Sequence, residues 1–273
     1  MPELPEVETA RAVLERAALD RRIVDVDDSD TFVLRPHLPG DVRAALVGRC
    51  LTAAHRQGKS MWCDTSDGGP VLGIHLGMSG KIVIAEADGT EIDGGDYWER
   101  GRQPGDYRFT RFALAFADGG RMLLVDPRRL GRVRLDPPVE KLGPDARAIT
   151  PAQFRTAITR GDAPVKARLL DQHALAGVGN LLADEILWQA GISPRRRTGS
   201  LSDVELDELR RATRRAIRNA IRRGGAHTGE LNPERQAGGR CPRDGTELAR
   251  ARIGGRTTYW CPEHQPDTPG ASS

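Results

Sequence analysis

The sequence has few cysteines and no long apolar run, and each of these absences excludes a class of protein. Its four cysteines among 273 residues are too few and too scattered for a disulfide scaffold. No apolar run approaches membrane-spanning length, and the first residues are charged throughout, unlike a signal peptide. A composition of 38% hydrophobic and 29% charged residues predicts a soluble cytoplasmic protein with two domains and room for a small third module.

The net charge of +3 says little about partners, but the charge is unevenly distributed. Ten arginines lie between Arg195 and Arg223 against four acidic residues, whereas the first forty residues are net acidic. Such a basic segment is typical of a surface that binds phosphates. A solvated, arginine-rich helix face is the alternative interpretation.

The N-terminal half begins with a helical pattern and continues with a strand pattern. From residue 23 to residue 134, short β-branched runs alternate with Gly and Asp turns, which predicts hairpins of a mainly antiparallel sheet structure. The polar, glycine-rich residues 86–107 are expected to form a mobile loop. The buried face of the preceding helix is expected to consist of Val7, Ala10, Leu14 and Ala17 or Ala18.

The helical period returns at residue 150. Thr150 is suited to an N-cap and Pro151 to the first helical position. Two further helices, over 164–175 and 181–191, are predicted on either side of the tight turn "AGVGN".

A longer helix follows, with start and stop signals at both ends. Ser202 and Glu205 are spaced as a capping box, and Gly224 is placed to end the helix. Its buried stripe is expected to consist of Leu209, Ala216, Ile217, Ala220 and Ile221.

The residues after this helix are too few to bury a core of their own and need a cross-link. Cys241 and Asp244 are three residues apart, as are Cys261 and His264, with sixteen residues between the pairs. Two ligand pairs on two turns predict a zinc ribbon, because each pair chelates from one knuckle. The alternative is a pair of thiols in a loop, with Asp244 serving only the "RDG" turn.

The turn "AGVGN" and the later "GGRTTYW" each have a phosphate-binding interpretation. Glycines allow close backbone approach, and Asn180 begins a helix whose amides favour an anion. Arg256, at the expected hairpin tip, can bind a phosphate bidentately. The alternatives are a helix-helix turn that needs positive φ and a solvated arginine.

Taken together, these segments resemble the formamidopyrimidine-DNA glycosylase and endonuclease VIII family of bacterial base-excision repair enzymes. The resemblance covers nearly the whole chain. It rests on "PELPEVE", "RQGKSMW", "HLGMSG", "DPRRLGRV", "LLDQHALAGVGNLLADEILWQAGISP" and "GGRTTYWCPEHQ".

The resemblance implies an α+β fold, in which an N-terminal helix and a two-sheet β-sandwich precede a helix-two-turn-helix domain and a zinc-ribbon hairpin. It also implies a monomer that binds damaged or abasic double-stranded DNA in a cleft between the domains, in the bacterial cytoplasm at the nucleoid. The expected segments are a catalytic domain over 1–135, a linker over 136–149, the helical domain over 150–225, a zinc finger over 236–267 and a disordered tail over 268–273.

By resemblance, removal of Met1 exposes the secondary amine of Pro2, which attacks the sugar C1′ of a flipped, damaged nucleotide. The chemistry is consistent, because a terminal amine has a pKa of about 8 against about 10.4 for lysine and is more often the free base at pH 7. Attack by a secondary amine leads to a cationic iminium, the electron sink for strand cleavage by β,δ-elimination. Glu3 is suited to general acid-base work on the sugar. Lys59 matches a family lysine that assists elimination.

Further positions match the family in order along the chain. Those expected to bind the DNA backbone are His75, Lys166, Asn180 and Arg256. Those expected to fill the void left by the flipped base and to address the opposite base are Met78, Arg128 and Leu130. Glu6 matches an acid near the lesion pocket, and the metal ligands are expected to be Cys241, Asp244, Cys261 and His264, holding one structural zinc ion.

Three features depart from the purine-repair branch of the family. Leu130 stands where that branch has Phe, and Asp244 and His264 replace two cysteines of the usual finger. Only fifteen residues separate Gly225 from Cys241, whereas enzymes for 8-oxoguanine carry a longer segment that caps the flipped purine. Oxidised pyrimidines or formamidopyrimidines are therefore favoured as substrates, although Met78 and Arg128 keep the purine-branch arrangement.

Two alternatives to an oxidised-base glycosylase and abasic-site lyase stay open. A non-catalytic DNA-binding protein is one, because helix-two-turn-helix modules also occur in proteins without base-excision activity. The other is an enzyme of the same scaffold for bulky or crosslinked adducts, which an uncapped pocket could admit.

Overall fold

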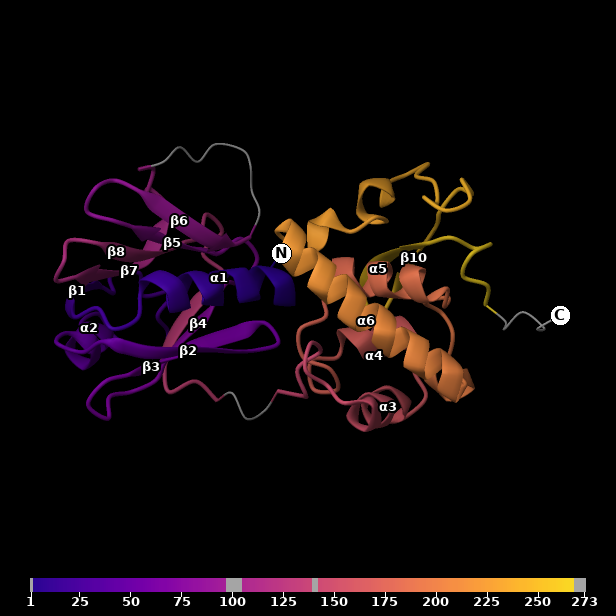
Figure 1. The fold of residues 1–273 in the computed structure, drawn as a ribbon, viewed down its shortest axis with the longest axis horizontal. Helices are drawn as coiled ribbons and strands as arrows, with labels where there is room; N and C mark the ends of the chain where they lie inside the picture. Colours follow the sequence, from indigo (N-terminus) through magenta and orange to yellow (C-terminus); the bar gives the residue numbers. More distant parts are fainter. Residues whose placement is uncertain (1, 97–104, 139–141, 268–273) are drawn as a thin grey trace. The chain divides into compact units, whose positions relative to one another are not determined.

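The computed structural model describes residues 2–96, 105–138 and 142–267 (Figure 1). Its contacts divide the chain into two compact units. The first holds Met1–Pro2 and Glu6–Glu140, and the second holds Glu3–Pro5 and Lys141–Ser273. The division along the chain therefore falls within the segment 136–149.

The first unit combines the N-terminal helix α1 (Leu4–Ala17) with two antiparallel sheets. The five-stranded sheet has the order β1 (Ile23–Asp27), β7 (Thr110–Phe116), β8 (Arg121–Val125), β5 (Lys81–Ala85) and β6 (Glu91–Gly95). The four-stranded sheet has the order β2 (Leu51–Gln57), β3 (Ser60–Thr65), β4 (Leu72–His75) and β9 (Arg132–Leu135). The α+β class and the antiparallel pairing agree with the sequence patterns.

One core lies between these sheets and α1. It forms because alternate side chains of each strand point to one face of its sheet. Met61 and Val133 from the four-stranded sheet join Phe112 and Leu124 from the five-stranded sheet in a single apolar cluster. The expected buried face of α1 is confirmed, with Val7, Ala10, Leu14 and Ala18 at most 1% exposed.

Two elements of this unit differ from the expectations. A short helix α2 (Asp41–Leu46) has no counterpart among them. Residues 86–107 are not one loop, because Glu91–Gly95 form β6, while 97–104 lie outside the described residues. Within β6, Gly94 is required because α1 passes close to its backbone. A Cβ on Gly94 would lie 2.5 Å from the Thr9 carbonyl oxygen.

The second unit is mainly helical. Thr150 and Ser202 cap their helices in capping boxes with Gln153 and Glu205, and Gly224 ends the last helix at φ +94°, all in agreement with the sequence signals. The helices are α3 (Pro151–Thr159), α4 (Val165–Leu170), α5 (Asn180–Ala190) and α6 (Asp203–Arg223), with 3-10 turns η2 (Thr198–Ser200), η3 (Ala226–Thr228) and η4 (Asn232–Glu234). The expected stripe of α6 is buried except at Ile221, which is partly buried.

Helix α4 is shorter than the expected helix over 164–175. It ends at Leu170 because the side chain of Gln172 replaces the next helical donors. Its Nε2 donates to the carbonyl oxygens of Leu170 and Val178, both at 2.9 Å. Gln172 Oε1 accepts from the amide of Gly177 at 3.0 Å, so this side chain shapes the turn before α5.

A two-stranded hairpin, β10 (Ala249–Ile253) and β11 (Arg256–Trp260), lies in the C-terminal part of the second unit. A small core beneath it contains Trp188, Leu248 and Cys261. The tail 268–273 lies outside the described residues. Within the described part of the chain, none of the helices has both the length and the apolar character needed to cross a membrane.

Candidate nucleic-acid and catalytic site

The carboxylate of Glu3 is bound by the N-terminus of α5. The amides of Gly179, Leu181 and Leu182 donate to its two oxygens at 3.0, 2.8 and 3.0 Å. Glu3 is 1% exposed. Three N–H donors at the positive end of a helix stabilise the ionised carboxylate, and they fix the position of the residue that follows Pro2.

The glycines of "AGVGN" are needed for two different reasons. Gly177 has φ +113°, which only glycine adopts readily. Gly179 is extended, but a Cβ there would lie 2.3 Å from Glu3 Cδ. Amides of this turn and of the start of α5 therefore bind the Glu3 carboxylate, where the sequence predicted a DNA phosphate.

Pro2 and Glu6, on either side of Glu3, are also buried, and Glu6 is 3% exposed. Pro2 lies before α1 rather than within it, because the helix begins at Leu4. The amide of Leu4 donates to the Gly177 carbonyl oxygen at 3.1 Å.

Lys166 is fully buried in the second unit. Its Nζ lies 2.6 Å from Asp184 Oδ1 and 2.8 Å from Thr258 Oγ1, and both ionic side chains are 0% exposed. Burial lowers the pKa of Lys166, and the attraction of Asp184 opposes this shift. The Lys166 ammonium has no face toward solvent, and its expected contact with the DNA backbone stays a prediction.

Asn180 and Arg256 lie at the junction of α5 and the hairpin. Asn180 Nδ2 donates to the Thr257 carbonyl oxygen at 3.1 Å, and Lys166 Nζ donates to the same oxygen at 3.3 Å. Arg256 is exposed at the start of β11. The turn before it packs on α4, since a Cβ on Gly254 would lie 3.0 Å from Ala167 Cα. These contacts hold the tip of the hairpin in place.

In the first unit, the structure brings Lys59 and His75 together. Lys59 occupies the two-residue turn between β2 and β3, and His75 ends β4. The pKa of His75 is lowered, because the surrounding protein desolvates the ring and because Lys59 and Arg132 are nearby cations. The Gly77 amide donates to His75 Nδ1 at 3.0 Å, so the neutral ring carries its proton on Nε2, as a donor.

Met78, Arg128 and Leu130 lie on two loops that touch. Arg128 is exposed, Leu130 is 37% exposed and Met78 is half-buried. The loops meet at Gly77, where a Cβ would lie 2.3 Å from the carbonyl carbon of Leu130. The three residues expected to enter the DNA stack therefore share one support.

That support includes Asp126, which is 0% exposed and which the sequence reasoning missed. Ser79 Oγ donates to Asp126 Oδ1 at 2.5 Å, and the amides of Arg128 and Gly131 donate to the carboxylate at 3.1 and 2.7 Å. One side chain thus binds both loops. A signal was present, because Asp126 opens "DPRRLG" and Ser79 lies in "HLGMSG".

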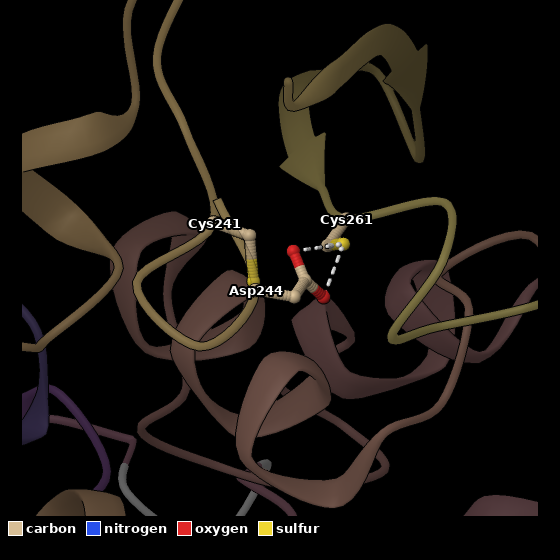
Figure 2. Close-up of side chains that lie close together, drawn as sticks. All are labelled: Cys241, Asp244 and Cys261. Carbon is tan, nitrogen blue, oxygen red and sulfur yellow. Dashed lines mark hydrogen bonds between the residues drawn. The ribbon is translucent and has the colours of Figure 1, made fainter. Parts of the chain in front are cut away.

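Three donors suited to a metal ion converge beneath the hairpin. Cys241 Sγ, Cys261 Sγ and an oxygen of Asp244 lie within 4.8 Å of one another (Figure 2). The Thr246 amide lowers the pKa of Asp244 to about 2, and burial raises the pKa of Cys261 to about 11. The Cys261 thiol donates to Asp244 Oδ2 at 3.3 Å. Two thiols and a carboxylate are ligands that suit zinc. The His264 backbone amide donates to Cys261 Sγ at 3.2 Å and so helps to orient this ligand.

The fourth expected ligand does not join this cluster. His264 Nε2 lies 2.8 Å from the Trp188 carbonyl oxygen and 2.6 Å from Arg243 Nη1. Its ring also meets the Trp188 ring edge to face. The His264 side chain is thus directed to α5, and the structure brings together three of the four expected ligands.

Comparison with known proteins identifies the family. The N-terminal domain of formamidopyrimidine-DNA glycosylase matches residues 1–133, and the helix-two-turn-helix domain of the same protein matches residues 142–231. A formamidopyrimidine-DNA glycosylase of Chloroflexus aurantiacus is 32% identical over 97% of this chain and 98% of its own. One of a Nocardioides species is 34% identical over 97% of this chain and 95% of its own.

Solved structures give the same result. The Lactococcus lactis glycosylase bound to abasic-site DNA has a TM-score of 0.79 and 26% identity, covering 97% of this chain and 99% of its own. The same enzyme bound to DNA containing FAPY-dG also has a TM-score of 0.79. The chain belongs to the formamidopyrimidine-DNA glycosylase family of DNA glycosylases.

Proposed function

We propose that this protein excises damaged bases from DNA and then cleaves the abasic strand, with Pro2 as the nucleophile. Once Met1 is removed, the Pro2 nitrogen attacks the sugar C1′ while the bond from C1′ to the base breaks. The sugar ring then opens to an iminium, which permits successive β- and δ-elimination of the flanking phosphates. Glu3 exchanges protons with the sugar, and Lys59 assists elimination at the adjacent phosphate.

The observation that carries this proposal is the binding of Glu3 by three amides of the α5 N-terminus. Catalysis needs a nucleophile held within a fraction of an ångström of its productive position. Residue 2 is covalently next to that anchored side chain, so its own position is restricted. A non-catalytic DNA-binding protein has no use for such an anchor.

The remaining roles follow from placement and charge. His75, with Nε2–H as a donor, Asn180 and Arg256 bind backbone phosphates, and Lys166 supports the hairpin from within. Met78, Arg128 and Leu130 fill the void left by the flipped nucleotide. Glu6 contributes to the lesion pocket.

The substrates we favour are formamidopyrimidines and oxidised pyrimidines rather than 8-oxoguanine. The segment after α6 is short and tied to α5, because Glu185 Oε2 accepts from the Leu231 amide at 3.0 Å. Leu231 is 0% exposed. A segment bound in this way has no spare length to cover a flipped purine.

Borohydride trapping on a duplex with one abasic site tests the chemistry. We expect a covalent adduct with the wild-type protein after Met1 removal is verified by mass spectrometry, and none with Pro2→Gly. Gly179→Ala, which displaces the Glu3 side chain, should lower the trapping rate at least tenfold. Gly199→Ala is the matched control, because Gly199 has an ordinary φ and its Cβ would meet only the exposed side chain of Asp162, at 3.3 Å. An adduct of undiminished yield with a blocked N-terminus would refute the mechanism.

A panel of damaged duplexes tests the substrate. Excision of formamidopyrimidine or oxidised pyrimidine faster than 8-oxoguanine is expected. Faster processing of bulky or crosslinked adducts would favour the alternative enzyme of this scaffold. Binding to every duplex without release of any base would favour the non-catalytic alternative.

We also propose that Cys241, Asp244 and Cys261 hold one structural zinc ion. When bound, zinc would stabilise the two turns beneath the hairpin. Metal analysis should give about one zinc per chain, and Cys241→Ser should lose it, whereas His264→Ala should retain it. Zinc loss in His264→Ala would show that the ring turns toward the metal.

A further inference from the structure

Strand β9 presents two arginines on the face of its sheet opposite the core. Val133 is 0% exposed and Leu135 packs against the same core, so the alternation of the strand directs Arg132 and Arg134 away from it. In register with these residues, His75 pairs with Arg132 and Gly73 pairs with Arg134 on β4. The arginines therefore adjoin the residue proposed to donate to a DNA phosphate.

The surface between these side chains is hollowed. A cavity of about 60 Å³ is lined by the polar residues Ser60, His75, Arg132 and Arg134, together with residues of β4 and the apolar Met61 and Pro137. All its lining polar side chains are donors, or hydroxyls that can donate. Its chemistry suits an anionic oxygen.

A neighbouring loop adds a third cation and an exposed aromatic ring. The Arg35 guanidinium lies 3.9 Å from the ring centroid of Phe32, and the Arg132 guanidinium lies 5.0 Å from it. Phe32 is 38% exposed. Arg134 Nε donates to the Arg35 carbonyl oxygen at 3.2 Å. Arg132 Nη1 donates to the Gly131 carbonyl oxygen at 2.7 Å, and the stacking of the guanidinium groups on the ring does not use their remaining N–H donors.

These three arginines are not neutralised within the described part of the chain, where no ion pair joins Arg35, Arg132 or Arg134 to a carboxylate. The nearby Asp30 is instead engaged by Arg129, at 3.0 and 2.9 Å. Partial burial lowers the pKa of Arg132, repulsion from Arg35 and Arg134 adds to the shift, and the attraction of the buried Asp126 carboxylate opposes it. Holding like charges together costs free energy, which an anionic partner would recover.

We propose that Arg35, Arg132 and Arg134 form a second backbone-binding patch that grips phosphates of the DNA duplex beside the damaged nucleotide. The inference rests on the proposed function, because the patch continues the surface of Lys59 and His75. It adds contacts that are independent of the base sequence and of the lesion. Its effect is to hold the duplex before and after excision, without touching the reacting sugar.

The test measures binding to an undamaged duplex of 25 base pairs at a series of salt concentrations. For Arg132→Gln/Arg134→Gln we expect the slope of log K against log salt to fall by about 2, at about 0.9 per phosphate contact. Arg35→Gln should lower it by about 1. The matched control, Arg16→Gln/Arg22→Gln, removes two exposed arginines of the same unit and should leave the slope unchanged.

Two further measurements separate the possible failures. Circular dichroism verifies that each variant is folded, and borohydride trapping by the wild-type protein and by the control Arg16→Gln/Arg22→Gln verifies the chemistry independently of the patch. An unchanged slope in the patch variants, or an equal loss in the control, overturns the patch and leaves the proposed function standing. Absence of both binding and trapping in the wild-type protein overturns the proposed function itself.

Discussion

Two buried aspartates, one in each unit, are satisfied in opposite ways. Asp126 accepts from a hydroxyl and two backbone amides, all neutral. Asp184 faces two cations, with Lys166 Nζ at 2.6 Å and Arg235 Nη2 at 2.9 Å, and it also accepts from the Tyr259 amide at 3.2 Å. Both are 1% exposed or less.

The difference shows what each carboxylate can support. The neutral donors belong to the loops themselves, so Asp126 fixes the backbone around Arg128, whose side chain is exposed. Asp184 joins α4, α5, β11 and the segment of Arg235 through charge, and it thereby withdraws Lys166 from solvent. Lys166, which was predicted to bind DNA, thus contacts Thr257 and Thr258 of the hairpin that bears Arg256.

The largest effect is expected from Asp184→Asn. Removing one partner of a buried ion pair leaves Lys166 without its counter-charge, which typically costs about 3–5 kcal/mol. Urea unfolding, together with hydrogen exchange of the α5 amides, measures the loss. Lys166→Met in the Asp184→Asn background should recover part of it. A loss below about 1 kcal/mol would mean that the ion pair contributes little.

A smaller effect is expected from Asp126→Asn. The amide nitrogen of the new Asn side chain would face one of the groups that now donate to the carboxylate. This leaves a buried N–H unsatisfied, at a cost of about 1–3 kcal/mol. Ser79→Ala, which removes one hydrogen bond, should cost about 1 kcal/mol. Faster hydrogen exchange at Gly131 and weaker discrimination of the base opposite the lesion are the accompanying signs. Unchanged exchange at Gly131 would contradict the support assigned to Asp126.

The smallest effect concerns the titration of His75, beside the patch in the first unit. Its pKa is lowered below the ordinary 6.5, so the unfolded chain binds the proton more tightly than the folded protein. The free energy of unfolding should therefore fall as the pH drops below 6.5 toward the folded pKa. Titration by NMR should give a midpoint below 6.5, and Arg132→Gln should raise it toward 6.5. A midpoint that does not move in Arg132→Gln would show that Arg132 does not affect the pKa of His75.

Local features of this protein could be predicted because their causes are local. The capping boxes of Thr150 and Ser202 and the stop at Gly224 each depend on residues within one turn of helix. Strand β6 was missed because its glycines are required by segments distant along the chain: Gly94 by the backbone of α1, and Gly95 by the backbone of Gly80 and Lys81. Helix α4 was predicted too long because the side chain of Gln172, rather than a proline or glycine, ends it.

The features of the candidate site also divide into those that the sequence predicted and those that depend on tertiary contacts. By itself, the sequence identified the family, the residue types at the N-terminus and the two knuckles of the hairpin, since motifs and spacing carry that information. Only the tertiary structure decided that the α5 N-terminus binds Glu3, that Lys166 is buried and that His264 turns to Trp188. Those outcomes depend on which residues distant along the chain come into contact. They also depend on whether a charged group gains more free energy from its partners in the protein than it loses by leaving water.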